Sequence, residues 1–148
     1  MTHFILEPGV SLGLGETAEL AEGSDRHGRQ RFVTADLDLF EIPAADISTA
    51  SGHYFLSQPL ADAYDASGLT GLVKRDSRIG LDSQMEELGE FTGQQMPILV
   101  CYSVEGDYPD ADFSHQLGTY GLIVSAPAMA LLESFDLTDC VIEAFPAL

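Results

Sequence analysis

Hydrophobic residues occur along the chain in short runs that predict β-strands separated by polar turns. Residues 31–42 alternate between apolar and polar side chains, which is typical of a half-buried strand, and Pro43 ends this run. The alternation slips at Asp36, so a β-bulge is expected there. Compact apolar runs predict three further strands, at 53–56, 69–73 and 96–104.

A short amphipathic helix is predicted directly after the run at 53–56. Ser57 is expected to cap its first turn, Pro59 is tolerated there because the first amide groups of a helix have no partners, and Gly68 ends it. Apolar residues then recur at helical spacing. The predicted inner face consists of Leu60, Ala63, Tyr64 and Ser67.

The same strand-helix-strand pattern occurs twice, at an offset of 68 residues. Five identical positions connect the copies: Ser57 with Ser125, Pro59 with Pro127, Leu69 with Leu137, Thr70 with Thr138, and Val73 with Val141. These are capping and helix-to-strand positions, so they indicate a structural repeat. The alternative is that two unrelated segments share the strand-Ser-x-Pro-helix-strand pattern because it is common among proteins.

These patterns predict a single α+β domain over residues 1–148. We expect a mixed sheet with few short helices and two similar strand-helix-strand units, at about 53–75 and 121–143. The length suits one hydrophobic core. The strand at 96–104 lies between the two units in the sequence.

The net charge of −18 is distributed unevenly, because all six basic residues precede residue 79. Twelve acidic residues follow, from Ile79 to Leu148, with no Lys or Arg among them. Copy two also carries Ile142 and Glu143 where copy one carries Lys74 and Arg75. Nucleic acids and anionic membranes need clustered Lys and Arg, so neither is expected as a partner. An anionic surface attracts a cationic partner; alternatively, the charge serves only solubility or adaptation to a salty cytoplasm.

Two further features concern the location of the protein. The first eight residues lack the positive and apolar regions of a secretory signal, so a cytoplasmic location is expected. No apolar run approaches the ~20 residues of a membrane-spanning helix.

Cys101 and Cys140 each lie in an apolar run, and we expect buried, reduced thiols rather than a disulfide or a metal site.

The segment 105–112, called the acidic loop below, contains four carboxylates. A partner-facing surface is predicted here, formed by Glu105, Asp107, Tyr108, Asp110, Asp112 and Phe113, with the two aromatic residues as anchors. A solvated loop without a partner is the alternative. A calcium loop is disfavoured, because Pro109 occupies its fifth position.

No motif in the chain predicts an active site. Ser57 and Ser125 are explained as helix caps, and the four histidines share no metal-binding or catalytic spacing. Asp36 and Asp38 share one face of a predicted strand and are interpreted as an outward acidic face. We therefore expect no catalytic residue, no metal ligand and no cofactor.

The segments 55–72 and 121–132 resemble a unit found in bacterial immunity proteins of polymorphic toxin systems. In that unit a hydrophobic strand, a Ser, a short amphipathic helix and a Gly-Leu-Thr-Gly return to a strand follow one another. The resemblance implies a stoichiometric inhibitor that binds and occludes a cognate toxin domain, with no catalysis of its own. With the charge of this chain, a basic toxin domain is the expected partner.

Two alternatives remain open on the sequence alone. The first is a small-molecule-binding or enzymatic domain with a pocket between the two units, near Tyr54, Tyr102 and Tyr120. The second is a structural or assembly subunit that is held by an exposed face of the strand at 96–104.

Overall fold

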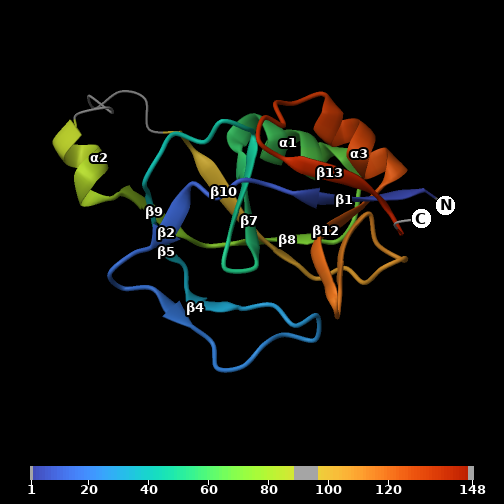
Figure 1. Cartoon of the computed structure of the whole chain (residues 1–148), viewed down its shortest axis with the longest axis horizontal. Coiled ribbons are helices and arrows are strands. Elements are labelled where there is room, and N and C mark those ends of the chain that lie inside the picture. Colours follow the sequence, from blue (N-terminus) through green and yellow to red (C-terminus); the bar gives the residue numbers. More distant parts are fainter. Residues whose placement is uncertain (1, 89–96, 147–148) are drawn as a thin grey trace.

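The computed structural model describes residues 2–88 and 97–146, in which strands dominate and the helices are short (Figure 1). The first sheet has the strand order β6-β7-β10-β8, and all neighbours in it are antiparallel. Helix α1 connects β7 to β8. The elements of this unit are β6 (Ile47–Ala50), β7 (His53–Ser57), α1 (Gln58–Ser67), β8 (Leu72–Arg75) and β10 (Leu99–Val104).

The second sheet has the strand order β11-β12-β1-β13 and is also antiparallel throughout. Helix α3 connects β12 to β13, as α1 connects β7 to β8. The elements of this unit are β1 (His3–Glu7), β11 (Phe113–Gln116), β12 (Thr119–Ser125), α3 (Ala126–Glu133) and β13 (Val141–Phe145).

The two sheets share one plan. In each, a hairpin is followed by a helix and then by a strand at the far edge, and a central strand lies between the hairpin and that edge strand. The offset of 68 residues holds in the pairing register. Phe55 and Arg75 lie opposite Cys101 in the first sheet, as Ile123 and Glu143 lie opposite Ile5 in the second. The predicted α+β class and the two units are confirmed. Both unit sheets are antiparallel, and mixed pairing occurs in a smaller third sheet.

The central strands are exchanged between the units. Strand β1 precedes the first unit in the chain but lies in the second sheet, between β12 and β13. Strand β10 precedes the second unit but lies in the first sheet, between β7 and β8. The apolar strand expected at 96–104 lies between the two units in the sequence, and its described part, β10, lies within the first sheet in space; Met96 lies outside the described residues. Each sheet is thus completed by a strand that precedes the other unit in the chain.

Two carboxylates join the units at equivalent places. Asp46 accepts a hydrogen bond from the Ser57 hydroxyl at 2.7 Å and another from the backbone N–H of Asp136, after α3, at 2.7 Å. Asp112 accepts from the Ser125 hydroxyl at 2.7 Å and from the backbone N–H of Thr70, after α1, at 3.1 Å. Each of these bridging carboxylates therefore holds the cap of its own helix and the segment that follows the helix of the other unit.

Both serines also cap their helices as predicted, since Ser57 Oγ accepts from the N–H of Leu60 and Ser125 Oγ from that of Ala128. Gly68 ends α1 in the left-handed conformation, with φ 76°. The helix caps and the first-turn prolines were therefore predictable from local sequence.

The main core contains residues of both unit sheets and of both helices. Helices α1 and α3 lie next to each other and are in contact (Figure 1). The buried helix positions correspond at the 68-residue offset: Leu60, Ala61 and Tyr64 in α1, and Ala128, Met129 and Leu132 in α3. The predicted inner face of α1 is wrong at two positions. Ala61 is buried and Ser67 is exposed, because α1 packs against α3 as well as against its own sheet.

A second core covers the opposite face of the first sheet, around Phe55 and Cys101. It is closed by the third sheet, of order β2-β5-β9, in which β5 and β9 are parallel. The remaining elements are β2 (Leu12–Leu14), β3 (Glu19–Leu20), β4 (Phe32–Thr34), β5 (Asp36–Leu39), β9 (Arg78–Leu81) and α2 (Ser83–Leu88). The single strand predicted at 31–42 is divided at Ala35, because β4 pairs with β3 whereas β5 pairs with β2 and β9 in another sheet. No helix in the described part of the chain is long and apolar enough to cross a membrane.

The bridging carboxylates give a first prediction. Asp46→Ala removes two hydrogen bonds to a carboxylate and Asp112→Ala removes three, and each change should lower the free energy of unfolding by about 2 kcal/mol. In a double-mutant cycle, Asp112→Ala and Ser125→Ala should couple by about 1 kcal/mol, because the two side chains share a hydrogen bond. Urea denaturation measures both quantities.

The control is Glu133→Ala, which removes an exposed carboxylate from α3 and should change stability by less than about 0.5 kcal/mol. If Asp46→Ala or Asp112→Ala were as mild as this control, the proposed role of these carboxylates would be refuted.

Candidate functional site

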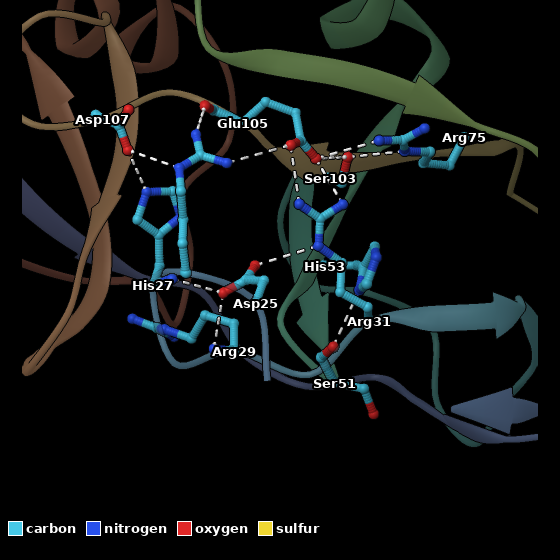
Figure 2. Close-up of polar contacts among 11 residues, drawn as sticks. Asp25, His27, Arg29, Arg31, Ser51, His53, Arg75, Ser103, Glu105 and Asp107 are labelled. Carbon is cyan, nitrogen blue, oxygen red and sulfur yellow. Dashed lines mark hydrogen bonds and ion pairs between the residues drawn. The ribbon is translucent and has the colours of Figure 1, made fainter. Parts of the chain in front are cut away.

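The acidic loop is held by ion pairs against a turn at residues 24–31, called the basic turn below (Figure 2). Glu105 accepts hydrogen bonds from Arg31 at 2.8 Å, from Arg75 at 3.1 Å and from the Ser103 hydroxyl at 2.9 Å. Burial by itself raises the pKa of Glu105, but the hydrogen bonds from Arg31 and Ser103 outweigh burial and lower that pKa to about 2. Glu105 is therefore ionised and bound within its own chain.

Asp25 shapes the basic turn. Its carboxylate accepts the backbone N–H groups of His27 at 2.9 Å and Arg29 at 3.0 Å, and it contacts Arg31 Nε at 3.3 Å. Such Asp-to-backbone bonds are a common local means of closing a turn. Burial opposes ionisation of Asp25, but the two backbone bonds and the charge of Arg31 outweigh it, so the pKa of Asp25 lies below its usual value.

Asp107 holds the other end of the loop. Its carboxylate lies 2.5 Å from His27 Nε2 and 3.1 Å from Arg26 Nε. The bond with His27, followed by that with Arg26, lowers the pKa of Asp107. Arg26 also forms an ion pair with Glu105 at 3.8 Å. The two acidic residues of the loop's first half thus face the same basic turn.

The network contains as many carboxylates as guanidinium groups. Its three carboxylates belong to Asp25, Glu105 and Asp107, and its three guanidinium groups belong to Arg26, Arg31 and Arg75. Half of the basic residues of the chain are therefore used here as internal counter-charges. The net charge of −18 originates outside the network.

The remaining predicted partner-binding residues have different surroundings. Tyr108 is half-buried, with its ring edge-on to His3 at 4.9 Å and to Phe145 at 5.0 Å between centroids. Asp110 is exposed and has no ion pair with a described residue. Tyr108 thus connects the acidic loop to the end of β13.

Asp112 and Phe113 stabilise the fold. Asp112 is one of the two bridging carboxylates, and Phe113 is only 1% exposed, in the main core. Gly71 passes so close to this segment that an added Cβ would clash with the Phe113 carbonyl oxygen, and its φ of 113° favours glycine. The ring of Phe113 does not reach the surface, so it cannot serve as an exposed anchor.

Three carboxylates without an ion pair to a described residue lie within β13 and in the segment that leads into it. We call the exposed residues Asp136, Asp139, Val141, Ile142 and Glu143 the acidic edge. Val141 is 52% exposed and Ile142 41% exposed. Among the described strands β13 pairs with β1 alone, so its other side has no strand partner in that part of the chain. None of the three carboxylates forms an ion pair with any residue in 2–88 or 97–146.

The equivalent edge of the first unit differs in charge. At the 68-residue offset, β8 carries Lys74 and Arg75 in place of Ile142 and Glu143. Lys74 pairs with Asp65 at 3.0 Å, and Arg75 belongs to the network around Glu105. The two edges thus have the same backbone plan and different chemistry.

Asp36 and Asp38 flank a third ion-pair site, at the paired strands β5 and β9. Asp36 accepts hydrogen bonds from the Thr17 hydroxyl at 2.6 Å and N–H at 2.9 Å, and both carboxylates contact Arg78. The hydrogen bonds from Thr17, followed by the contact with Arg78, lower the pKa of Asp36. The outward position predicted for Asp36 is wrong, since it is only 3% exposed; its polar partners come from distant segments that local spacing does not reveal.

Both cysteines are free, with Cys101 buried and Cys140 partly buried. Burial raises the pKa of the Cys101 thiol to about 12, so it is protonated at neutral pH. Within the described ranges, no group of three or more His, Cys, Asp or Glu residues has a geometry that would hold a metal ion.

A cleft of about 380 Å³ lies between the two units, and Tyr54 and Tyr120 line it. Tyr102 is buried elsewhere, with its hydroxyl bonded to Asp65 at 3.2 Å. The structure therefore brings together two of the three tyrosines that the sequence associated with a pocket. Arg29, which the sequence did not single out, lines the same cleft.

Comparisons of the chain with protein-family models, with curated proteins and with solved structures found no match.

Glu105 provides a second prediction, on stability. Glu105→Gln should lower the free energy of unfolding at pH 7 by about 2 kcal/mol, because charge-assisted hydrogen bonds to two arginines are lost. The lowered pKa means that this contribution is complete above the ordinary carboxyl value of 4.5 and is lost as the pH falls toward about 2. The difference between wild type and variant in urea denaturation should therefore shrink between pH 5 and pH 3.

Asp110→Asn is the matched control, since it removes one charge from the same loop at an exposed, unpaired position. Its effect should stay below about 0.5 kcal/mol at every pH. A Glu105→Gln effect that did not depend on pH would contradict this account of the network.

Proposed function

We propose that this chain is an immunity-type protein that binds and neutralises a cognate bacterial toxin, and that the acidic edge is its binding surface. The observation that carries the proposal is the group of three exposed carboxylates, two in the segment before β13 and one within it, beside the exposed aliphatic side chains of this strand. The acidic edge lies in a half of the chain that has no Lys or Arg of its own.

Charge complementarity indicates the class of partner. The three carboxylates of the acidic edge have no cation to neutralise them among the described residues, so their field extends into solvent. Such a field speeds encounter with a basic protein and repels acidic ones. A basic toxin domain fits this surface, and its association should weaken with salt.

Contact chemistry supports a protein partner in particular. Val141 and Ile142 supply apolar area that gains free energy when covered, and the free side of β13 can pair with a strand or loop of the partner. Tyr108 and Asp110 of the acidic loop extend this surface past Phe145. Glu105 and Asp107 then act indirectly, because their arginine contacts fix the shape of the loop.

Binding kinetics with a candidate toxin test the proposal, using the toxin domain encoded beside this protein. The triple variant Asp136→Asn, Asp139→Asn and Glu143→Gln keeps the shape of each side chain and removes three charges. It should slow association about tenfold at low salt, and the difference from wild type should shrink as salt rises. Wild type should also protect cells that express the toxin, and the variant should protect them less.

The matched control is Glu16→Gln, Glu19→Gln and Glu22→Gln, which removes the same charge from exposed positions in the first part of the chain. This control should slow association less than about threefold. Equal effects of the two triple variants would refute the acidic edge as the surface. A toxin candidate that bound no better than an unrelated basic protein would refute the proposed function.

A further inference from the structure

The cleft between the units is separate in chemistry from the acidic edge. Its walls come from the second sheet at Glu7 and Tyr120, from the turn between β6 and β7, and from the segment that follows β1. The β6–β7 turn belongs to the first unit, so the cleft exists only where both units meet. Its volume of about 380 Å³ suits a small organic molecule.

Arg29 is the cation of this cleft. Each of the other five basic side chains lies within 4.0 Å of a carboxylate, whereas Arg29 has no such partner in the described part of the chain. Its Nη2 donates to the carbonyl oxygens of Thr119 at 2.9 Å and Gly121 at 3.0 Å. These two bonds fix the guanidinium and leave three of its five N–H donors without a partner among those residues. In a chain of net charge −18, an uncompensated and positioned guanidinium is a site for an anion.

Apolar side chains surround this cation. The ring of Tyr120 lies 5.5 Å from the Arg29 guanidinium carbon, and 78% of Tyr120 is exposed. Val10 and Leu14, each 51% exposed, line the same cleft. Exposed apolar groups beside a convergent polar group are typical of a ligand site.

The other polar groups of the cleft limit the charge of a ligand. Tyr54 shares a hydrogen bond of 3.0 Å with His115, and burial lowers the pKa of His115 to about 3, so this pair is uncharged at neutral pH. Glu7 also lines the cleft and repels a second negative charge. A monoanion is favoured over a dianion.

We propose that the cleft binds a small monocarboxylate with an apolar body, whose carboxylate accepts hydrogen bonds from Arg29 and whose body covers Val10, Leu14 and Tyr120. This ligand site is independent of toxin binding, since the residues of the cleft are not those of the acidic edge.

Isothermal titration calorimetry of the full chain tests this, with 3-phenylpropionate as the probe and the neutral 3-phenylpropanamide as its isostere. Wild type should bind the carboxylate about tenfold more tightly than the amide, because only the carboxylate forms charge-assisted bonds with Arg29. Arg29→Gln should remove this preference. Arg26→Gln removes the same charge outside the cleft and should change either affinity less than about twofold.

Arg29 also holds two backbone carbonyl groups, so a second variant keeps the test decisive if Arg29→Gln does not fold. Leu14→Asp places a carboxylate at the half-exposed rim and leaves the Arg29 contacts intact. It should weaken 3-phenylpropionate several-fold more than 3-phenylpropanamide. Equal affinity of wild type for the two probes, no binding of either, or equal losses in Arg29→Gln and Arg26→Gln would overturn the proposal.

Discussion

The exchange of central strands between the two units is the constraint on which the rest of the structure depends. Strand β1 pairs on both sides with strands of the second unit, and β10 pairs on both sides with strands of the first. Neither sheet is continuous without the strand that precedes the other unit. The bridging carboxylates Asp46 and Asp112 add polar contacts across the same boundary. Because His3 pairs with Ser125 and Phe145, the sheet of the second unit forms only when β1 pairs with β12 and β13, which lie more than a hundred residues later in the chain.

Strand exchange also determines where charged residues meet. Glu105 follows β10 directly, so placing β10 in the first sheet brings Glu105 beside Arg75 of β8 and beside the basic turn. Arg26, Arg31 and Arg75 are thereby paired with carboxylates of the same chain. The second half has no cations, and its carboxylates at Asp136, Asp139 and Glu143 stay exposed in and before β13. Uneven charge in the sequence becomes an anionic edge in space for this reason.

The duplicated backbone supports two different kinds of surface. At equivalent edges, β8 carries Lys74 and Arg75 in ion pairs, whereas β13 presents Ile142 and Glu143 to solvent. The same helix positions are buried in both copies, because both helices pack in one core. The residues at the two strand edges differ between the copies. The cleft around Arg29 arises where the units meet, so it belongs to neither copy alone.

The sequence by itself determined the features that depend on neighbours along the chain. Ser57, Ser125 and Gly68 cap helices wherever such residues stand at helix ends, and the 68-residue repeat revealed both units and the asymmetry of their edges. Only the tertiary structure decided the exchange of β1 and β10, the inward position of Asp36, and the two arginines that donate hydrogen bonds to the Glu105 carboxylate from 30 and 74 residues away. Hydrophobic periodicity and capping act over a few residues, whereas strand order and ion pairing depend on which distant segments share one core.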